Sequence, residues 1–218
     1  MTVIGTSASF GSDESKVDLD GMAELRQVGG RLSPDSWHID AVLPPDASEM
    51  VYEDLQPVAA AMQECEVLQE GNGVSVFDDE ELGVQVVELL GRRCCVTLPC
   101  SSILRHLCLH MKALDKFFSF EVEIVDDTKR YRYIEISNTR SVADIGTDRA
   151  LLPLRLEEGW QRVNIDLDRT VRLAFGSSYL TTSQVTIRAS ARVAKVFFQS
   201  QEFSDFELPS HLRVVAER

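Results

Sequence analysis

The chain of 218 residues is long enough for one large domain or two small ones, and its apolar share (44%) and charged share (26%) are typical of a globular protein. It contains no apolar run of the roughly eighteen residues that a membrane span needs, and no charged start followed by an apolar core. We therefore expect an intracellular protein without a membrane span.

Charge is unevenly distributed along the chain, whose formal net charge is −13. Residues 1–90 hold 19 acidic and 3 basic side chains, whereas residues 91–218 hold 16 acidic and 19 basic ones. The excess of acids disfavours non-specific binding of nucleic acid, because phosphates would be repelled. Any acidic partner must therefore meet local basic surface in the C-terminal part.

The front of the chain is polar before it becomes strand-rich. Residues 1–34 are rich in Gly, Ser, Asp and Glu, which predicts an acidic arm ordered by a partner surface, followed by a single domain over residues 35–218. Trp37 begins the first core segment. Pro57 suits the first turn of a short helix, although helix and strand patterns compete there. Strands are predicted at residues 74–77, 83–90 and 93–98.

A central stretch from Leu98 to Ser137 carries the clearest local patterns. Its first half has apolar residues at three- and four-residue steps as far as Phe118, which predicts a helix beginning after Pro99. From Ser119 the apolar residues alternate instead, which predicts a β-hairpin with its turn at residues 126–129.

The two strands of this hairpin carry opposite charges. Glu121 and Glu123 lie on the first strand, and Arg130 and Arg132 lie on the return strand. We expect the arginines to face the glutamates across the hairpin, where such a pair contributes about 0.2–1 kcal/mol.

Short strands dominate the remainder. A polar loop at 137–149 is followed by a strand at 151–156, a turn at 157–160, a strand at 161–167 and a short helix closed by Gly176. Three further strands are predicted at 178–182, 184–190 and 191–198, and the tail is expected to pack Phe203, Phe206 and Leu208. Many short strands with two brief helices predict an all-β sandwich or jelly roll.

The search for reactive or metal-binding groups yields no complete set. His106 and His110 have the spacing of two metal ligands on a helix, but Leu107 stands where a metalloprotease motif needs Glu, and no third ligand is indicated. Nothing resembles a phosphate-binding glycine loop or a nucleophile elbow. We therefore predict no catalytic, cofactor-binding or metal residues, and no enzyme activity.

The cysteines likewise indicate no active site. Their odd number and the adjacent Cys94-Cys95 pair argue against a secreted disulfide framework, and no C-x-x-C spacing or adjacent His would activate a thiolate. Reduced, partly buried thiols are expected. The five are Cys65, Cys94, Cys95, Cys100 and Cys108.

The sequence allows two roles for one tryptophan. Trp160, in EEGWQ, would anchor a ligand such as a sugar if its ring were exposed, or would pack in the core beside the Gly159 turn. The sequence favours the core.

Three segments, residues 98–127, 152–198 and 203–215, closely resemble the cilia- and flagella-associated protein twenty family. The points of likeness are the FFSFEVEIVDD hairpin, the RLEEGW turn, the AFGSSYL turn and the acidic ELP near the end. The resemblance implies a single jelly-roll domain, similar to carbohydrate-binding modules, that needs no cofactor. The front portion departs from the family pattern, because residues 1–34 are extra and the chain is acidic, so we expect a divergent member.

The resemblance also implies a place in the cell. It suggests an axonemal protein at the inner junction of doublet microtubules, where family members help seal the B-tubule to the A-tubule. The implied partners are tubulin, the parkin co-regulated protein and a WD-repeat protein, and centriolar or basal-body and nuclear roles are also implied.

Two functions from different classes follow. The first is a non-catalytic adaptor of the ciliary doublet; since tubulin is acidic, contact would use basic residues of the C-terminal part. The second is a ligand-binding jelly roll that recognises a glycan or a glutamylated tail. The basic candidates are Arg140, Arg149, Arg188, Arg192 and Lys195.

Overall fold

Two β-sheets make up most of the protein, as seen in a computed structural model that describes residues 39–44, 57–69, 71–91, 93–114, 117–209 and 212–213. In this part of the chain six strands form one sheet, in the order β11-β6-β13-β4-β3 with β1 paired to β13. Its strands are β1 (Ile39–Leu43), β3 (Val74–Asp79), β4 (Val84–Leu89), β6 (His106–Ala113), β11 (Trp160–Asp166) and β13 (Ala191–Gln199).

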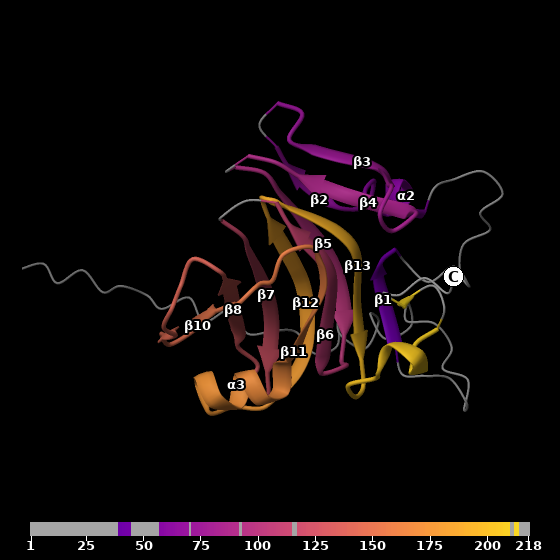
Figure 1. Cartoon of the computed structure of the whole chain (residues 1–218). Helices are drawn as coiled ribbons and strands as arrows, with labels where there is room; N and C mark the ends of the chain where they lie inside the picture. The colour runs from indigo at the N-terminus through magenta and orange to yellow at the C-terminus, as the bar shows by residue number, and fades with distance from the viewer. Residues whose placement is uncertain are drawn as a thin grey trace, which may run out of the picture.

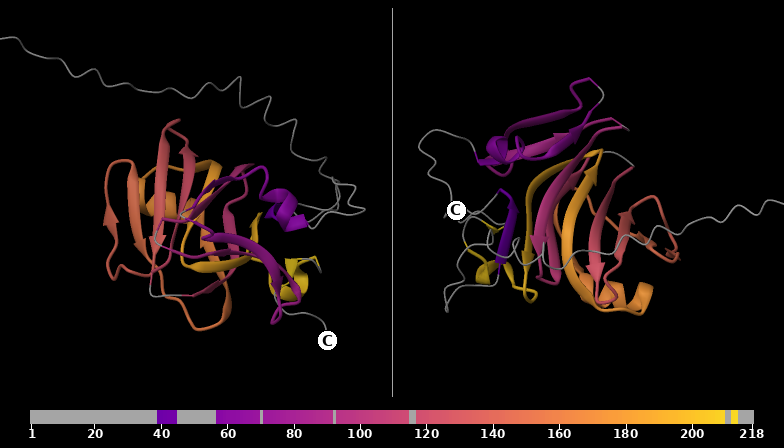
Figure 2. Two further views of the ribbon diagram at one scale, coloured as in Figure 1. Left: turned by 90° about the horizontal axis from the view of Figure 1, so that it is seen from above. Right: turned by 180° about the vertical axis from the view of Figure 1, so that it is seen from behind.

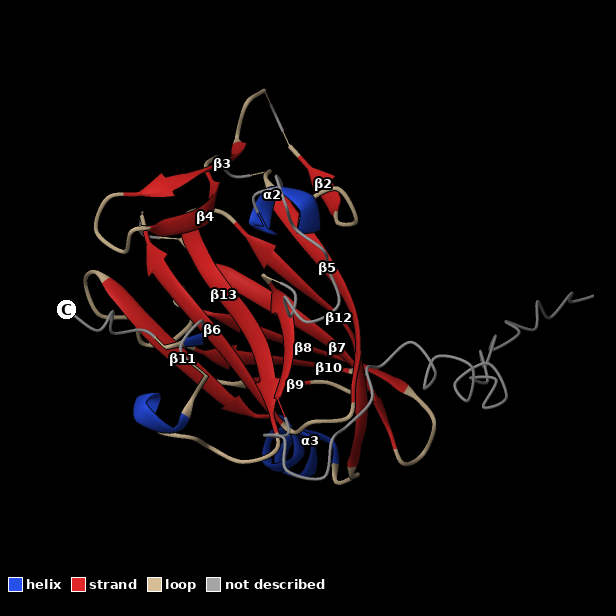
Figure 3. Ribbon diagram, turned by 90° about the vertical axis from the view of Figure 1, so that its right-hand side faces the viewer, coloured by secondary structure: helices blue, strands red, loops and turns tan. Residues whose placement is uncertain are grey.

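The second sheet has seven described strands in the order β2-β5-β12-β7-β8-β10-β9. They are β2 (Glu66–Leu68), β5 (Cys95–Ser102), β7 (Ser119–Asp126), β8 (Tyr131–Ser137), β9 (Asp144–Ile145), β10 (Arg149–Pro153) and β12 (Tyr179–Arg188). The helices α2 (Pro57–Ala61) and α3 (Leu167–Phe175) lie at opposite ends of the sandwich (Figures 1 and 3). The predicted all-β, jelly-roll type of sandwich is confirmed.

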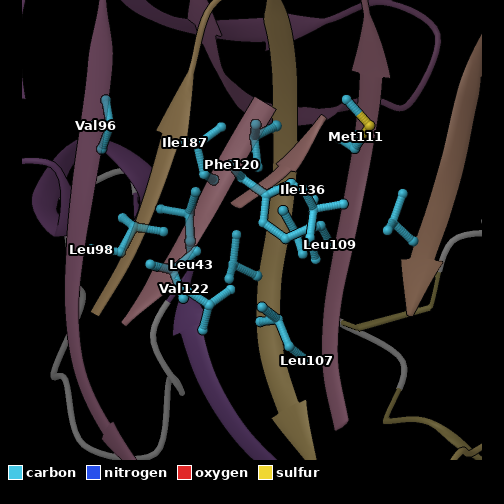
Figure 4. Packing of buried hydrophobic residues seen from close by; sticks show 14 of the residues in the cluster. Leu43, Val96, Leu98, Leu107, Leu109, Met111, Phe120, Val122, Ile136 and Ile187 are labelled. Carbon is cyan, nitrogen blue, oxygen red and sulfur yellow. The ribbon is translucent and has the colours of Figure 1, made fainter. Parts of the chain in front are cut away.

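The two sheets are seen from two further sides in Figure 2, and an apolar cluster fills the space between them (Figure 4). Phe120, Val122 and Ile124 of β7 are fully buried in it and meet Leu107 and Leu109 of β6. Burying side chains of this size contributes about 1.5–3 kcal/mol each, so the inward faces of β6 and β7 account for much of the stabilisation.

The helix predicted after Pro99 is wrong, because that stretch forms β5 and β6. In β6 the inward residues Leu107, Leu109 and Met111 alternate with the outward residues His106, Cys108 and His110, and all six are buried. The segment does alternate in sequence, with His106, Cys108 and His110 on one face and Leu107, Leu109 and Met111 on the other. The prediction failed because Leu104, Leu107 and Met111 also follow the three- and four-residue steps of a helix, so both periods fit this stretch.

The hairpin predicted from residue 119 is confirmed as β7 and β8, which pair antiparallel. The expected facing of its charges is wrong. Arg132 lies opposite Ile124 and binds Asp126 at the end of β7, while Glu121 is paired by Arg149 of β10. The sequence predicts Asp126, the acidic partner of Arg132, to lie in the turn, whereas the structure buries it at the end of β7.

Helix α3 ends at Gly176 as the sequence predicts, but it begins at Leu167, inside the segment predicted as a strand. The side chain of Asp166 accepts a hydrogen bond from the N–H of Arg169 at 3.0 Å, and Gly176 adopts the left-handed conformation (φ 69°) that ends the helix. The short helix at Pro57 and the strands at 74–77, 83–90, 93–98, 151–156 and 161–167 are also found, with shifted ends.

Two expectations near the C-terminus need correction. The segments predicted as two strands over 178–190 form one, β12, which is irregular where it pairs with β5 and β7. Phe203 and Leu208 are buried as expected, but Phe206 is 88% exposed. Trp37 and the arm at 1–34 lie outside the described residues, and within those residues no helix is long and apolar enough to cross a bilayer.

Candidate functional site

The outward face of the six-stranded sheet carries an unusual row of basic side chains. Arg162 of β11 and Lys195 of β13 both lie directly opposite His110 of β6, so the three side by side form what we call the basic row. His110 and Lys195 are buried, and Arg162 is half-buried. Two cationic side chains that flank a histidine on one face require neutralisation or covering.

The C-terminal segment, residues 201–209 with 212 and 213, provides that cover. Phe203, Leu208 and Leu212 pack against the outward residues Cys108 and Phe197. This small apolar cluster holds the segment against the sheet, beside β1 and β13 (Figure 1).

Backbone carbonyls of the same segment receive the charged side chains. Arg162 Nη2 donates to the carbonyl of Phe203 at 2.9 Å, and Lys195 Nζ donates to the carbonyl of Arg213. Hydrogen bonds from charged donors are roughly twice as strong as neutral ones. Much of the basic row is therefore engaged within the protein.

His110 is held neutral in this setting. Burial first, and then the positive charges of Lys195 and Arg162, lower the pKa of His110 to about 4 against the opposing effect of Asp205. Neither ring nitrogen of His110 has a hydrogen-bond partner among the described residues. His106 lies on the same strand face, and the flanking positive charges disfavour a cation beside His110.

Trp160 packs within the protein. Its ring centroid lies 5.2 Å from that of His110, the residue is half-buried, and its indole Nε1 is buried. The ring therefore contacts His110 over part of its surface, which agrees with the packing role that the sequence favours.

The cysteine thiols are poorly suited to chemistry. Burial raises the pKa of Cys100 and of Cys108 to about 12, and that of Cys65 to about 11. A thiol with such a pKa is almost fully protonated near neutral pH and is a weak nucleophile. All five cysteines are free.

Four of the five basic residues proposed from sequence are engaged within the protein. Arg149 Nη1 lies 2.5 Å from Glu121 Oε2 and 3.4 Å from Glu135 Oε2, and Arg188 also reaches Glu121, at 3.6 Å. These partners neutralise charge that an acidic surface would otherwise meet.

The other two engaged residues lie on β13. Arg192 binds Asp79 at 3.0 Å and Glu88 at 2.8 Å, and Lys195 is buried beneath the C-terminal segment. Arg140, which is exposed like Arg149, is the member of the five whose guanidinium has no ion pair with any described residue.

Arg140 shares a surface pocket with Arg155, which sequence reasoning missed. Strands β8 and β10 pair in parallel with Pro153 opposite Ser137, so the chain leaves both strands at the same edge of the sheet (Figure 1). The pocket there has a volume of about 740 Å³. It is lined by Asn138, Arg140, Ser141, Pro153, Leu154, Arg155 and Leu156.

No local signal identified Arg155, because it was placed inside a predicted strand. Its meeting with Arg140 depends on the parallel pairing of β8 with β10, which joins segments separated by the loop at 138–148. Strand pairing of this kind is not readable from the periodicity of either segment.

Comparison with known proteins places the chain in a family. The CFA20 domain model matches residues 56–216. Cilia- and flagella-associated protein 20 of Caenorhabditis elegans is 30% identical over 150 residues, covering 65% of this chain and 74% of that protein. Its counterpart of Chlamydomonas reinhardtii is 29% identical over 156 residues, covering 67% and 82%.

Solved structures with a similar arrangement include two carbohydrate-binding modules. The C-terminal CBM6 of LamC from Zobellia galactanivorans is 9% identical and covers 62% of this chain and 98% of that one, with a TM-score of 0.33. TmCBM61 in complex with β-1,4-galactotriose is 14% identical, with a TM-score of 0.34. The match covers 65% of this chain and 90% of TmCBM61. Since the family model spans most of the described residues, the chain belongs to the CFA20 domain family.

Proposed function

We propose that this protein is a non-catalytic structural component of the ciliary or flagellar axoneme, which binds doublet microtubules at the inner junction between the A- and B-tubules. There it would support cilium stability and motility. The observation that carries the proposal is the family match over residues 56–216, together with relatives named for cilia and flagella.

Its proposed partners are tubulin and neighbouring inner-junction proteins, namely the parkin co-regulated protein and a WD-repeat protein. Tubulin is acidic, and the exposed arginines of the pocket, Arg140 and Arg155, provide basic surface without an internal counter-ion among the described residues. Arg149, Arg188, Arg192 and Lys195 are less suitable because their charges are already engaged.

The test is fractionation of axonemes from ciliated cells that express the tagged full-length chain. We expect the protein to remain with doublets when membranes and matrix are removed at low salt, and to be released by concentrated salt, which screens ionic contacts. Release together with matrix proteins at low salt would contradict a doublet-bound role.

The alternative, a glycan-binding jelly roll, gains no support from Trp160. An aromatic platform for a sugar must present its ring face to solvent, whereas this ring packs against His110 with its indole nitrogen buried.

A further inference from the structure

We propose that the pocket at the shared edge of β8 and β10 binds a glutamate-rich segment of a partner protein. The ligand chemistry is argued from the pocket itself. The identity of the partner as a surface of the doublet rests on the proposed function.

The walls of the pocket are held in place before any ligand arrives. The N–H of Leu154 donates to the carbonyl of Ser137 at 2.8 Å, which joins the segment that follows β10 to the end of β8. Asn138 is fixed from both sides, because its N–H donates to the carbonyl of Phe118 at 3.2 Å and its Oδ1 accepts from the N–H of Phe118 at 2.8 Å. A site that is already ordered loses less entropy on binding.

The charge of the pocket is unbalanced. Arg140 and Arg155 are exposed, and neither guanidinium has an ion pair with a described residue. Arg149 and Arg192, by contrast, each bind two carboxylates. A guanidinium presents paired N–H donors that match the two oxygens of a carboxylate, so two such groups at one pocket favour a ligand with several carboxylates.

The remaining lining favours glutamate over aspartate or a bare anion. Pro153, Leu154 and Leu156 supply an apolar surface, and both leucines pack against the main core. The two methylene groups of a glutamate side chain would cover this surface while its carboxylate reaches an arginine. Aspartate has only one methylene group and inorganic phosphate has none.

The size of the pocket indicates a peptide. A volume of about 740 Å³ lies within the roughly 300–1,000 Å³ of typical ligand sites and exceeds the needs of a single side chain. A nucleic acid would also carry charge to meet the arginines, but its phosphates, like inorganic phosphate, have no methylene arm to cover the apolar lining of Pro153, Leu154 and Leu156.

The experiment measures fluorescence anisotropy of a labelled peptide of ten glutamates titrated with the full-length protein at moderate salt. We expect saturable binding that weakens as salt rises. The Arg140→Glu/Arg155→Glu variant should bind at least about tenfold more weakly, because two attractive charges become repulsive.

The matched control is Arg169→Glu on α3. Arg169 is exposed and does not line the pocket. Its substitution by Glu changes the net charge by the same amount as each of the two substitutions at the pocket. We expect this variant to bind the peptide within about twofold of the unmodified protein, and unchanged melting temperatures to show that all variants are folded.

Several outcomes would overturn the inference. Equal loss of binding in the Arg169→Glu variant would indicate diffuse charge attraction, and unchanged binding in the double variant would place the peptide elsewhere. Equal affinity for ten aspartates would remove the role of the apolar lining. Displacement by low-millimolar inorganic phosphate would reveal a phosphate site, and tighter binding of a single-stranded oligonucleotide would reveal a nucleic-acid site.

The same variants separate this inference from the proposed function. If the protein binds the peptide through Arg140 and Arg155 but is absent from doublets, the pocket stands and the axonemal role fails. If the unmodified protein and the Arg140→Glu/Arg155→Glu variant both stay on doublets and bind the peptide equally well, the axonemal role stands and the pocket inference fails.

Discussion

Arg132 Nε donates a hydrogen bond to Asp126 Oδ2 at 2.7 Å in a buried ion pair that joins the end of β7 to the start of β8, across the hairpin turn. The other oxygen of Asp126, Oδ1, accepts from the N–H groups of Thr128 and Arg130 and from the Thr128 hydroxyl, and Oδ2 also accepts from the Ser177 hydroxyl at 2.9 Å. One carboxylate therefore organises the hairpin turn and ties it to Ser177, which follows the C-cap residue Gly176 of α3.

Replacing this carboxylate is expected to be costly. The Asp126→Asn substitution leaves the buried Arg132 with only the exposed Asp148 as a negative partner, and we expect it to lower the free energy of unfolding by about 3 kcal/mol. Asp168→Asn is the matched control, because Asp168 pairs with exposed Arg172 on α3 and should change stability by about 0.5 kcal/mol or less. Urea denaturation at pH 7 distinguishes the two, and equal effects would contradict the assigned role.

The same carboxylate predicts sensitivity to acid. Burial alone would raise the pKa of Asp126, but hydrogen bonds from Thr128 and Arg132 outweigh it and hold the pKa at about 2, below the ordinary value of 3.8. Because the folded-state pKa is lower than the unfolded one, this stabilisation is present above about pH 4 and is lost as pH falls towards 2. The Asp126→Asn variant should therefore show a shallower loss of stability over that window in denaturation curves.

His110 predicts a second range of pH, above that of Asp126, in which the stability of the fold changes. Burial and the charges of Lys195 and Arg162 lower the pKa of His110 from 6.5 to about 4, while Asp205 acts in the opposite sense. Between these values the unfolded chain binds the proton and the folded chain does not, so stability falls as pH drops from about 6.5 to about 4, by up to about 3 kcal/mol from this residue. We expect His110→Gln to flatten that part of the stability profile; an unchanged slope would show that His110 titrates normally.

The C-terminal segment offers a comparison between two phenylalanines three residues apart. Phe203 is buried against the outward face of the six-stranded sheet, whereas Phe206 is 88% exposed. We expect Phe203→Ala to lower the free energy of unfolding by about 3 kcal/mol and Phe206→Ala to change it by less than about 0.5 kcal/mol. Thermal and urea unfolding would measure both, and a large effect of Phe206→Ala would show that its side chain is covered.

The thiols predict slow alkylation of the native protein. Because burial raises the pKa of Cys65, Cys100 and Cys108 to about 11 or 12, only a minute thiolate fraction exists at pH 8. Mass spectrometry after brief treatment with iodoacetamide should find these three cysteines unmodified, and all five modified after denaturation. Rapid modification of Cys108 in the native protein would mean that the C-terminal segment opens readily.

Sequence alone was sufficient wherever a segment has one solvated face or its own start and stop signals. The β7–β8 hairpin shows alternation because Glu121 and Glu123 point away from the core, and α3 ends at the glycine that the sequence marks as its stop, Gly176. The family resemblance also depended only on the order and spacing of such segments.

Tertiary structure decided the features that depend on covering and on pairing between distant segments. It decided that β6 is a strand, because residues 106–112 fit the period of a strand and that of a helix, and the pairing with β11 and β13 satisfies the backbone of a strand. It also brought Arg140 and Arg155 to one pocket through the parallel pairing of β8 with β10. Local periodicity reports which face of a segment is apolar, so it does not choose between two periods that both fit and carries no information on which strand lies beside another.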